Sequence, residues 1–278
     1  MEIFKTIAAL QGHLQNPDRK KPVGLVPTMG ALHSGHLTLI ETAKAQTATV
    51  VCSIFVNPTQ FTDTTDLDKY PRPIEADIEK LKQAKCDILF MPDVQEMYPQ
   101  KEYWHLDIGE IEHRLEGRFR PGHYQGVMQI VYKLFIAVKP DFAFFGQKDF
   151  QQVKVVEKMV ELKSLPVKLV MCPIIREADG LAMSSRNIHL STEERKHALV
   201  LSYALHQLKK SYVKEASAEL VKEAAEMISI EPQVQLEYLE IVNANNLDND
   251  LSDDSKGVIA LVAAKVGKTR LIDNMMLS

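Results

Sequence analysis

The feature that most constrains the fold is the alternation of short apolar runs with helical periodicity over the first two-thirds of the chain. Five runs have the length and the near-continuous apolar character of strands that are buried on both faces of a parallel sheet. They are Val23–Val26, Thr49–Val56, Asp87–Met91, Asp141–Phe145 and Val167–Ile174. Between them, apolar residues recur at helical spacing, as at Ile74, Ile78 and Leu81. Because strands that alternate with helices imply right-handed crossovers, this pattern predicts a doubly wound, Rossmann-like α/β domain.

The pattern changes in the last third of the chain. Ser191 and Glu194 have the spacing of a capping box, which predicts a long helix that runs toward Tyr212. The elements expected after it are a helix at Ala216–Ile228 and strands at Val234–Val242 and Gly257–Val266, with the polar stretch Asn243–Lys256 between the strands. We therefore expect a Rossmann-like parallel-sheet domain at residues 1–182 and a smaller C-terminal α+β domain at residues 183–278.

Composition and charge exclude several classes of protein. The 278 residues carry 33 basic and 37 acidic side chains, a net charge of −4, so a broad basic surface for nucleic acid or anionic membrane is not expected. No apolar run has the length of a membrane span, and the segment Met1–Lys5 lacks the pattern of a signal peptide. We expect a cytoplasmic protein with neither a nucleic-acid nor a membrane partner.

The three cysteines have no metal-site or disulfide pattern. Cys52, Cys86 and Cys172 are odd in number and have no Cys-x-x-Cys spacing. We interpret them as thiols of a reducing compartment, with no disulfide framework and no zinc site.

The first segment that carries chemistry is PTMGALHSGH at Pro27–His36, between the first predicted strand and a helix. Its glycines permit close backbone approach, and the helix start presents unpaired N–H groups that favour phosphate. His33 and His36, three residues apart, can donate hydrogen bonds from the same side. Two loop histidines are usually only surface polar groups. At the carboxyl end of the first strand of a doubly wound sheet, however, they indicate a phosphate site.

Two further segments have the chemistry of anion binding. Lys148 follows a predicted strand and offers a cation to phosphate, while Asp149 can accept hydrogen bonds from ribose hydroxyls; an exposed Lys148–Asp149 ion pair is the alternative. In Met183–Arg186, two serine hydroxyls beside an arginine fork suit a departing pyrophosphate. A hinge loop with a helix cap is the alternative for this segment.

Neutral amides follow the second predicted strand. Asn57 and Gln60 suit the hydroxyl and carboxylate groups of a small polar substrate. The pair Asn57-Pro58 is also ordinary turn chemistry, so this assignment depends on the other segments.

Together these segments resemble the pantothenate synthetase (pantoate–β-alanine ligase) family over nearly the whole chain. The motifs that carry the resemblance are, in order, PTMGALHSGH, FVNPTQF, YPR, RPGHYQGV at Arg120–Val127, GQKD, QQ and READGLAMSSRN. His-x-Gly-His alone is shared with other nucleotidyltransferases and, more distantly, with class I aminoacyl-tRNA synthetases, but the full set is specific. Two positions depart from the commoner forms of the family: Tyr124 replaces the usual Phe of the RPGHF run, and Thr62–Thr65 lacks the frequent Gly-Pro-Asn sequence. Neither departure falls on a residue assigned to chemistry, so both affect the expected shape of a loop rather than the expected reaction.

The resemblance implies an ATP-dependent ligation with Mg²⁺. Pantoate and ATP would give pantoyl adenylate and pyrophosphate, and β-alanine would then displace AMP to form pantothenate. The implied ATP-binding residues are Met29, Gly30, Ala31, Leu32, His33, Ser34, Gly35, His36, Gly146, Gln147, Lys148, Asp149, Ile175, Met183, Ser184, Ser185 and Arg186. Within residues 1–182 the nucleotide and pantoate would bind, residues 183–278 would act as a lid, and the protein would be a homodimer.

The resemblance also assigns individual roles. His36 would be the proton donor. The other residues expected to stabilise the transition state as donors are His33, Lys148, Ser184, Ser185 and Arg186. The residues expected to bind substrate are Gln60 and Gln152, together with Asn57 from its own chemistry. Asp77 would be a second-shell contact of the Mg²⁺ that binds the ATP phosphates.

Three alternatives stay open at this point. Another His-x-Gly-His nucleotidyltransferase, acting on a phosphorylated substrate, would need basic residues where Asn57, Gln60 and Gln152 are neutral. A nucleotide-sensing module would bind ATP without releasing pyrophosphate. A tRNA-binding synthetase fragment conflicts with the acidic balance of the chain and the lack of an obvious basic appended domain.

Overall fold

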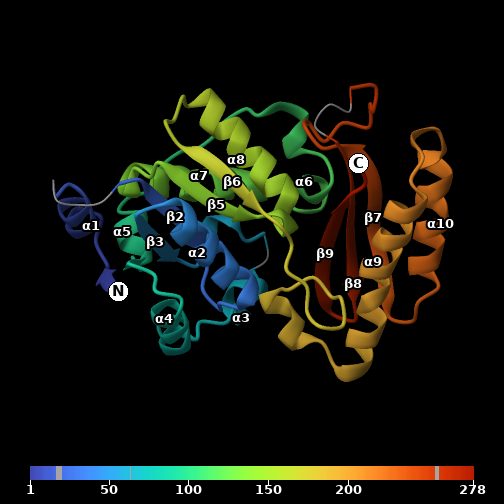
Figure 1. Ribbon diagram of the computed structural model, residues 1–278, viewed down its shortest axis with the longest axis horizontal. Coiled ribbons are helices and arrows are strands. Elements are labelled where there is room, and N and C mark those ends of the chain that lie inside the picture. The colour runs from blue at the N-terminus through green and yellow to red at the C-terminus, as the bar shows by residue number, and fades with distance from the viewer. Residues whose placement is uncertain (17–20, 63, 254–256) are drawn as a thin grey trace. The chain divides into compact units, whose positions relative to one another are not determined.

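The computed structural model describes residues 1–16, 21–62, 64–253 and 257–278. The chain forms two compact units (Figure 1). Unit 1 comprises Met1–Gly146 and Val155–Cys172, and unit 2 comprises Gln147–Lys154 and Pro173–Ser278. The division at residue 182 stays a prediction from the sequence pattern. Of the stretches named above, Asp63 and residues 254–256 lie outside the described residues.

Unit 1 is built on a six-stranded parallel sheet in the order β1-β4-β3-β2-β5-β6. Its strands are β1 (Glu2–Phe4), β2 (Val23–Thr28), β3 (Thr49–Ile54), β4 (Ile88–Phe90), β5 (Phe142–Gly146) and β6 (Lys168–Cys172). The chain builds outward from β2 to β3 and β4 and then crosses to β5 on the other side of β2. This reversal makes the carboxyl ends of β2 and β5 the topological switch point, where doubly wound sheets bind ligands.

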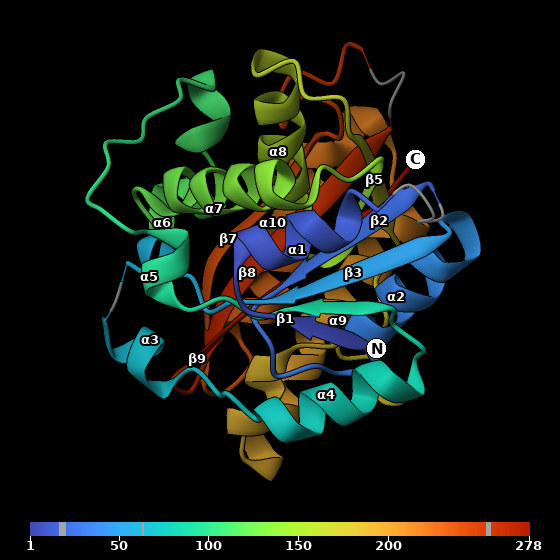
Figure 2. The same cartoon turned by 90° about the vertical axis from the view of Figure 1, so that its left-hand side faces the viewer.

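Helices cover both faces of this sheet. They are α1 (Ile7–Leu14), α2 (Ser34–Gln46), α3 (Thr64–Lys69), α4 (Ile74–Gln83), α5 (Val94–Met97), α6 (Glu116–Phe119) and α7 (His123–Val138), with the 3₁₀ turns η1 (Pro58–Gln60) and η2 (Gly109–Glu112). On one face, Ile40 of α2 and Leu81 of α4 are buried against Val26 and Cys52. On the other face α7 packs on β2 and α1, and Figure 2 shows α7 and α4 on opposite sides of the strands. Helix α8 (Phe150–Leu162) begins in unit 2 and continues into unit 1.

Unit 2 packs two helices on a three-stranded antiparallel sheet. Its elements are η3 (Gln147–Asp149), η4 (Ser185–His189), α9 (Thr192–Ser211), η5 (Lys214–Ala216), α10 (Ser217–Ser229), β7 (Val234–Asn243), β8 (Val258–Val266) and β9 (Thr269–Met276). The predicted capping box is confirmed: Ser191 N–H donates to Glu194 Oε2 at 2.8 Å, and Glu194 N–H donates to Ser191 Oγ at 3.2 Å. Leu205 of α9 and Ile228 of α10 are fully buried in the core that these helices form with the sheet.

The predicted fold class is confirmed, and two strands were not predicted. The five predicted strands of the parallel sheet correspond to β2–β6, with ends that differ by one or two residues. Strand β1 has only three residues, none of them buried, at the edge of the sheet, so it lacks an apolar run. Strand β9 contains the adjacent buried polar residues Asp273 and Asn274, which break both alternation and apolar continuity.

All three cysteines are buried free thiols. Burial raises the pKa of Cys52 well above its ordinary value and that of Cys86 to about 11, so neither is an activated nucleophile. None of the described helices is both long enough and apolar enough to cross a bilayer.

Candidate active site

The loop that follows β2 is fixed by a buried carboxylate. Gly30 and Ala31 both have left-handed backbone conformations, with φ of 81° and 49°. Asp77, which is 0% exposed, accepts the N–H groups of Ala31 and Leu32 at 2.7 Å each. One turn later on α4, Lys80 Nζ donates to the carbonyl of Leu32 at 2.6 Å. Helix α4 therefore holds the loop in the shape from which α2 begins.

The two histidines of the loop stack at the start of α2. His33 is the N-cap residue, and its ring centroid lies 4.1 Å from that of His36. His33 N–H donates to His36 Nδ1 at 3.3 Å. Because Nδ1 of His36 is thereby an acceptor, the neutral ring carries its proton on Nε2. His36 can therefore donate an N–H at the positive end of the α2 dipole, where an anionic group is favoured.

Gln60 lies at the centre of a hydrogen-bonded amide network beyond β3. Its Nε2 donates to the Met29 sulfur at 3.1 Å, and its Oε1 accepts from Asn57 Nδ2 at 3.2 Å. The Oδ1 of Asn57 accepts in turn from the hydroxyls of Tyr98, at 2.8 Å, and Thr59, at 3.1 Å. Burial raises the pKa of Tyr98 to about 12, so this hydroxyl stays protonated and able to donate at neutral pH.

The side chain of Asn57 is fully hydrogen-bonded within this network. Its side chain is 1% exposed, and its Nδ2 also donates to the carbonyl of Gly126 at 3.1 Å. Both amide donors and the amide oxygen of Asn57 thus have partners within unit 1. In this network Asn57 orients Gln60. The direct contact between Asn57 and substrate that the sequence suggested stays a prediction.

Helix α7 supports Gln60 from the other side. His123, 5% exposed, has its Nδ1 2.7 Å from the carbonyl oxygen of Gln60, and its Nε2 lies 3.1 Å from Arg120 Nη1. Since Arg120 can only donate, Nε2 accepts and Nδ1 carries the proton that bonds Gln60. A β-carbon on Gly126 would lie 2.3 Å from the carbonyl oxygen of Thr59, so this close approach requires glycine.

These positioning residues could not be assigned from the sequence. His123 and Gly126 fall within the quoted motif Arg120–Val127, but nothing in the pattern shows that they contact Gln60. Tyr98 lies in a segment without any signal for the site.

The carboxylate of Asp77 has two main-chain partners in the loop after β2. Both of its carboxylate oxygens accept main-chain N–H groups. Among the described residues no group of three His, Cys, Asp or Glu side chains is placed to hold a metal ion. A second-shell contact between Asp77 and Mg²⁺ stays a prediction.

Unit 2 contains the other predicted anion-binding residues. Lys148 is half-buried in η3, and no ion pair between it and Asp149 is found among the described residues. Ser184 is the N-cap of η4 and accepts the N–H of Arg186 at 3.2 Å. Lys148 and Ser184 line the same small cavity, together with Asn187 and Asp273.

The predicted site residues thus fall into two sets. Unit 1 carries Met29, Gly30, Ala31, Leu32, His33, Ser34, Gly35, His36, Asn57, Gln60, Asp77 and Gly146, and unit 2 carries Gln147, Lys148, Asp149, Gln152, Ile175, Met183, Ser184, Ser185 and Arg186. Within unit 1 the loop and Gln60 are in direct contact through Met29. Within unit 2 the main-chain N–H of Met183 donates to the carbonyl of Ile175 at 3.0 Å. Gln152 is half-buried in the first turn of α8.

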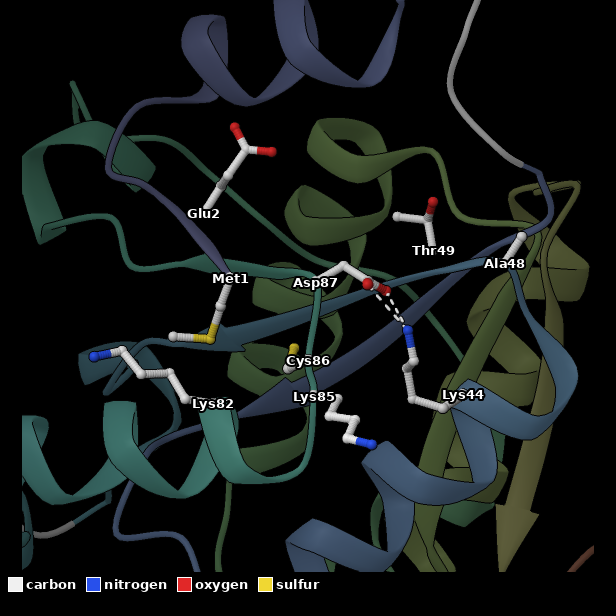
Figure 3. Close-up of a pocket in the computed structure, with 9 residues that line it drawn as sticks. All are labelled: Met1, Glu2, Lys44, Ala48, Thr49, Lys82, Lys85, Cys86 and Asp87. Carbon is white, nitrogen blue, oxygen red and sulfur yellow. Dashed lines mark hydrogen bonds and ion pairs between the residues drawn. The ribbon is translucent and has the colours of Figure 1, made fainter.

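A polar hollow of about 720 Å³ lies at the opposite, amino-terminal ends of β1, β3 and β4 (Figure 3). Its ion pair joins Lys44 Nζ to both carboxylate oxygens of Asp87, at 3.0 and 2.9 Å, and Asp87 also accepts the Val50 N–H at 2.7 Å. In Figure 3 the ammonium groups of Lys82 and Lys85 point away from this pair and from each other. Since its cations do not converge and lie opposite the ligand-binding edge, we interpret this hollow as structural.

Comparison with known proteins identifies relatives along the whole chain. The family model described as Pantoate-beta-alanine ligase matches residues 2–276. The pantothenate synthetase of Porphyromonas gingivalis is 46% identical over 280 residues, 99% of each chain, and that of Koribacter versatilis is 45% identical over 100% of this chain and 96% of its own.

Solved structures give the same result. The pantothenate synthetase of Thermus thermophilus has a TM-score of 0.91 at 41% identity, over 100% of this chain and 99% of its own. A pantoate-β-alanine ligase of Francisella tularensis, described as complexed with β-γ ATP and β-alanine, has a TM-score of 0.83 at 32% identity, over 100% and 98%.

Proposed function

The chain belongs to the pantoate–β-alanine ligase family and is a ligase, and from this premise we propose that it joins its two substrates through a pantoyl adenylate. ATP and pantoate would form the adenylate with release of pyrophosphate, and β-alanine would then displace AMP. The observation that carries this proposal is the fixed loop after β2, which presents the His36 Nε2–H at the start of α2.

The first step is an attack of the pantoate carboxylate on the α-phosphorus of ATP. As the bond to the bridging oxygen breaks, negative charge grows on the departing pyrophosphate. An N–H donor that meets this oxygen stabilises the transition state more than the ground state. We assign this role to His36, with His33 stacked against it at the N-cap of the same helix.

The ATP phosphates need further cationic and hydroxyl donors. Lys148 supplies an ammonium group, Ser184 and Ser185 supply hydroxyls, and Arg186 supplies a planar fork of N–H groups. Mg²⁺ enters as part of the substrate, bound to the phosphates; this ion keeps several of its waters and uses few protein ligands. The complex described for the Francisella tularensis ligase supports ATP and β-alanine as ligands.

Neutral amides recognise the acid substrate. Gln60 is held by Asn57 and His123, and its amide can bond the hydroxyl and carboxylate groups of pantoate without repelling that anion. We assign Gln152 the same role. In the second step the amine of β-alanine attacks the acyl carbon, an amide bond forms, and AMP leaves with the former carboxylate oxygen.

Family membership excludes the alternative of a nucleotide sensor without catalysis, and it also disfavours a tRNA-binding fragment. Family membership also disfavours the third alternative, a nucleotidyltransferase for a phosphorylated acceptor, whose second substrate would have to be bound by the neutral side chains around Gln60. We also expect a homodimer, which light scattering on the purified chain would test.

The test is a partial reaction. With ATP, Mg²⁺ and pantoate but no β-alanine, the enzyme should release about one equivalent of pyrophosphate per chain and retain the adenylate, as expected of a stepwise mechanism with a bound intermediate. Addition of β-alanine should then release AMP. A strict requirement for β-alanine before any pyrophosphate forms would contradict the two-step assignment.

A further inference from the structure

Strand β9 carries two adjacent polar residues that are both buried, which is unusual for a strand at the edge of a sheet. Asp273 is 4% exposed and Asn274 is 2% exposed. Because side chains alternate along a strand, the two point to opposite faces. Leu271 belongs to the core formed with α9 and α10, so Asp273 lies on the helix-facing side and Asn274 on the other. Buried polar groups are tolerated when they are hydrogen-bonded, so their partners indicate what the pair does.

Asp273 holds the hairpin that leads into Met183–Arg186. Its Oδ2 and Oδ1 accept from the two Nη atoms of Arg176 at 2.7 and 3.0 Å, a two-point ion pair with the carboxylate side chain 3% exposed. The same guanidinium donates to the carbonyl of Gly180 at 3.1 Å and so closes the turn of the hairpin. Arg176 pairs with Ala182, next to the start of Met183–Arg186.

Asn274 holds the Lys148 turn from the opposite face of β9. Its Nδ2 donates to the carbonyls of Gln147, at 2.9 Å, and Lys148, at 3.0 Å, while its Oδ1 accepts from Gln147 Nε2 at 3.2 Å. The N–H of Asn274 donates to Asp273 Oδ1 at 2.7 Å. The Lys148 turn and the hairpin that leads into Met183–Arg186 are far apart in the sequence, and both are hydrogen-bonded to the same dipeptide of β9.

We propose that Asp273 and Asn274 are positioning residues that set the place of Lys148 relative to the donors of Met183–Arg186. This proposal rests on the phosphate-binding roles assigned above to those residues. Lys148 and Ser184 border one cavity together with Asp273, so a shift of either segment changes the spacing of the donors that the ATP phosphates would meet. The pair acts on the adenylation step, since the attack of β-alanine expels AMP and needs no pyrophosphate donors.

The first test is Asn274→Ala. Misplacement of a catalytic group by about 1 Å costs on the order of 10²-fold in rate, so pantoate-dependent pyrophosphate formation should slow by about that factor. The reaction of β-alanine with supplied pantoyl adenylate should change little, a split that a purely structural role would not produce. Asn274→Asp keeps the shape of the side chain but removes its two N–H donors. It should slow pyrophosphate formation and leave the reaction of β-alanine with pantoyl adenylate unchanged, and it replaces the alanine variant if that variant does not fold.

Arg270→Ala is the matched control on the same strand. Arg270 Nε bonds Glu237 Oε2 of β7 at 2.7 Å, so this variant removes an ion pair between strands of the sheet and should keep the rate of pyrophosphate formation. A folded Asn274 variant that is as fast as Arg270→Ala would overturn the proposal, and so would equal slowing of both partial reactions.

A double-mutant cycle separates this proposal from the function on which it rests. If Asn274 acts through Lys148, the variant Lys148→Ala/Asn274→Ala should form pyrophosphate no more slowly than Lys148→Ala alone. If the rate of the double variant instead fell by the product of the two single-variant effects, Asn274 would not act through Lys148, and the positioning role would be rejected. If Lys148→Ala itself keeps the wild-type rate, then the phosphate role of Lys148 fails instead.

Discussion

Substitution of Asp77 by asparagine tests whether the loop after β2 is held as the structure shows. The carboxylate accepts two main-chain N–H groups, each at 2.7 Å, in a site with no solvent exposure. An amide offers one oxygen, and its NH₂ group would face the second N–H, a donor against a donor. One buried N–H then loses its partner, which costs roughly 1–3 kcal/mol.

Two measurements follow for Asp77→Asn. Urea unfolding should show a free energy of unfolding lower by about 1–3 kcal/mol, from the unsatisfied N–H. Pyrophosphate formation should slow by up to about 10²-fold, because His36 follows directly on the loop that loses its anchor. The matched control is Glu79→Gln on the same helix, since the Glu79 side chain is 61% exposed and neither quantity should change.

A magnesium titration decides between anchoring and a metal role for Asp77. If Asp77 acted through Mg²⁺, a higher concentration of the ion would restore the rate of the asparagine variant. The hydrogen bonds to Ala31 and Leu32 predict no such rescue. Restoration of the rate by Mg²⁺, or wild-type stability and rate in Asp77→Asn, would show that these hydrogen bonds do not anchor the loop.

Three further changes test the other parts of the site. His36→Asn should fold and bind ATP yet form adenylate about 10²–10³-fold more slowly in single-turnover assays, the usual cost of one lost transition-state donor; a near-normal rate would remove His36 from that role. Gly126→Ala places a β-carbon 2.3 Å from the Thr59 carbonyl oxygen, so overpacking should cost about 1–3 kcal/mol in thermal unfolding and raise KM for pantoate more than for ATP; equal KM values would contradict the link to Gln60. Burial raises the pKa of Tyr98 from 10.0 to about 12, and the unfolded chain therefore loses this proton first as pH rises. Between pH 10 and about 12 the wild type should therefore lose stability relative to Tyr98→Phe. If the melting temperatures of the two proteins changed in parallel over this range, the Tyr98 hydroxyl would not contribute to the pH dependence of stability.

The sequence alone was sufficient to predict those elements whose local residue pattern is distinctive. Apolar runs such as Thr49–Val56 locate the central strands, and the glycines of Pro27–His36 mark the tight loop that follows β2. The resemblance to a family then adds roles to residues that pattern alone leaves ambiguous, such as Lys148.

Sequence pattern fails for residues whose function depends on distant partners. Asn57 looks like a substrate contact at the end of a strand, and only the fold shows that Tyr98 and Gly126 already occupy its amide. Asn274 bonds the carbonyl of Gln147, 127 positions away, and no local periodicity encodes such a contact. Its burial beside Asp273 also made β9 unrecognisable in the sequence, because two adjacent buried polar residues match neither the alternating nor the continuous apolar pattern of a strand.

Transfer of labelled oxygen shows whether the enzyme activates the pantoate carboxylate as an adenylate. With both carboxylate oxygens of pantoate labelled with ¹⁸O, an adenylate intermediate leaves one of them on the phosphate of AMP when β-alanine attacks the acyl carbon. Mass spectrometry of the products should therefore find one labelled oxygen in AMP and none in pyrophosphate. Unlabelled AMP, or label in orthophosphate beside ADP, would show that the carboxylate is activated in another way and would contradict the account.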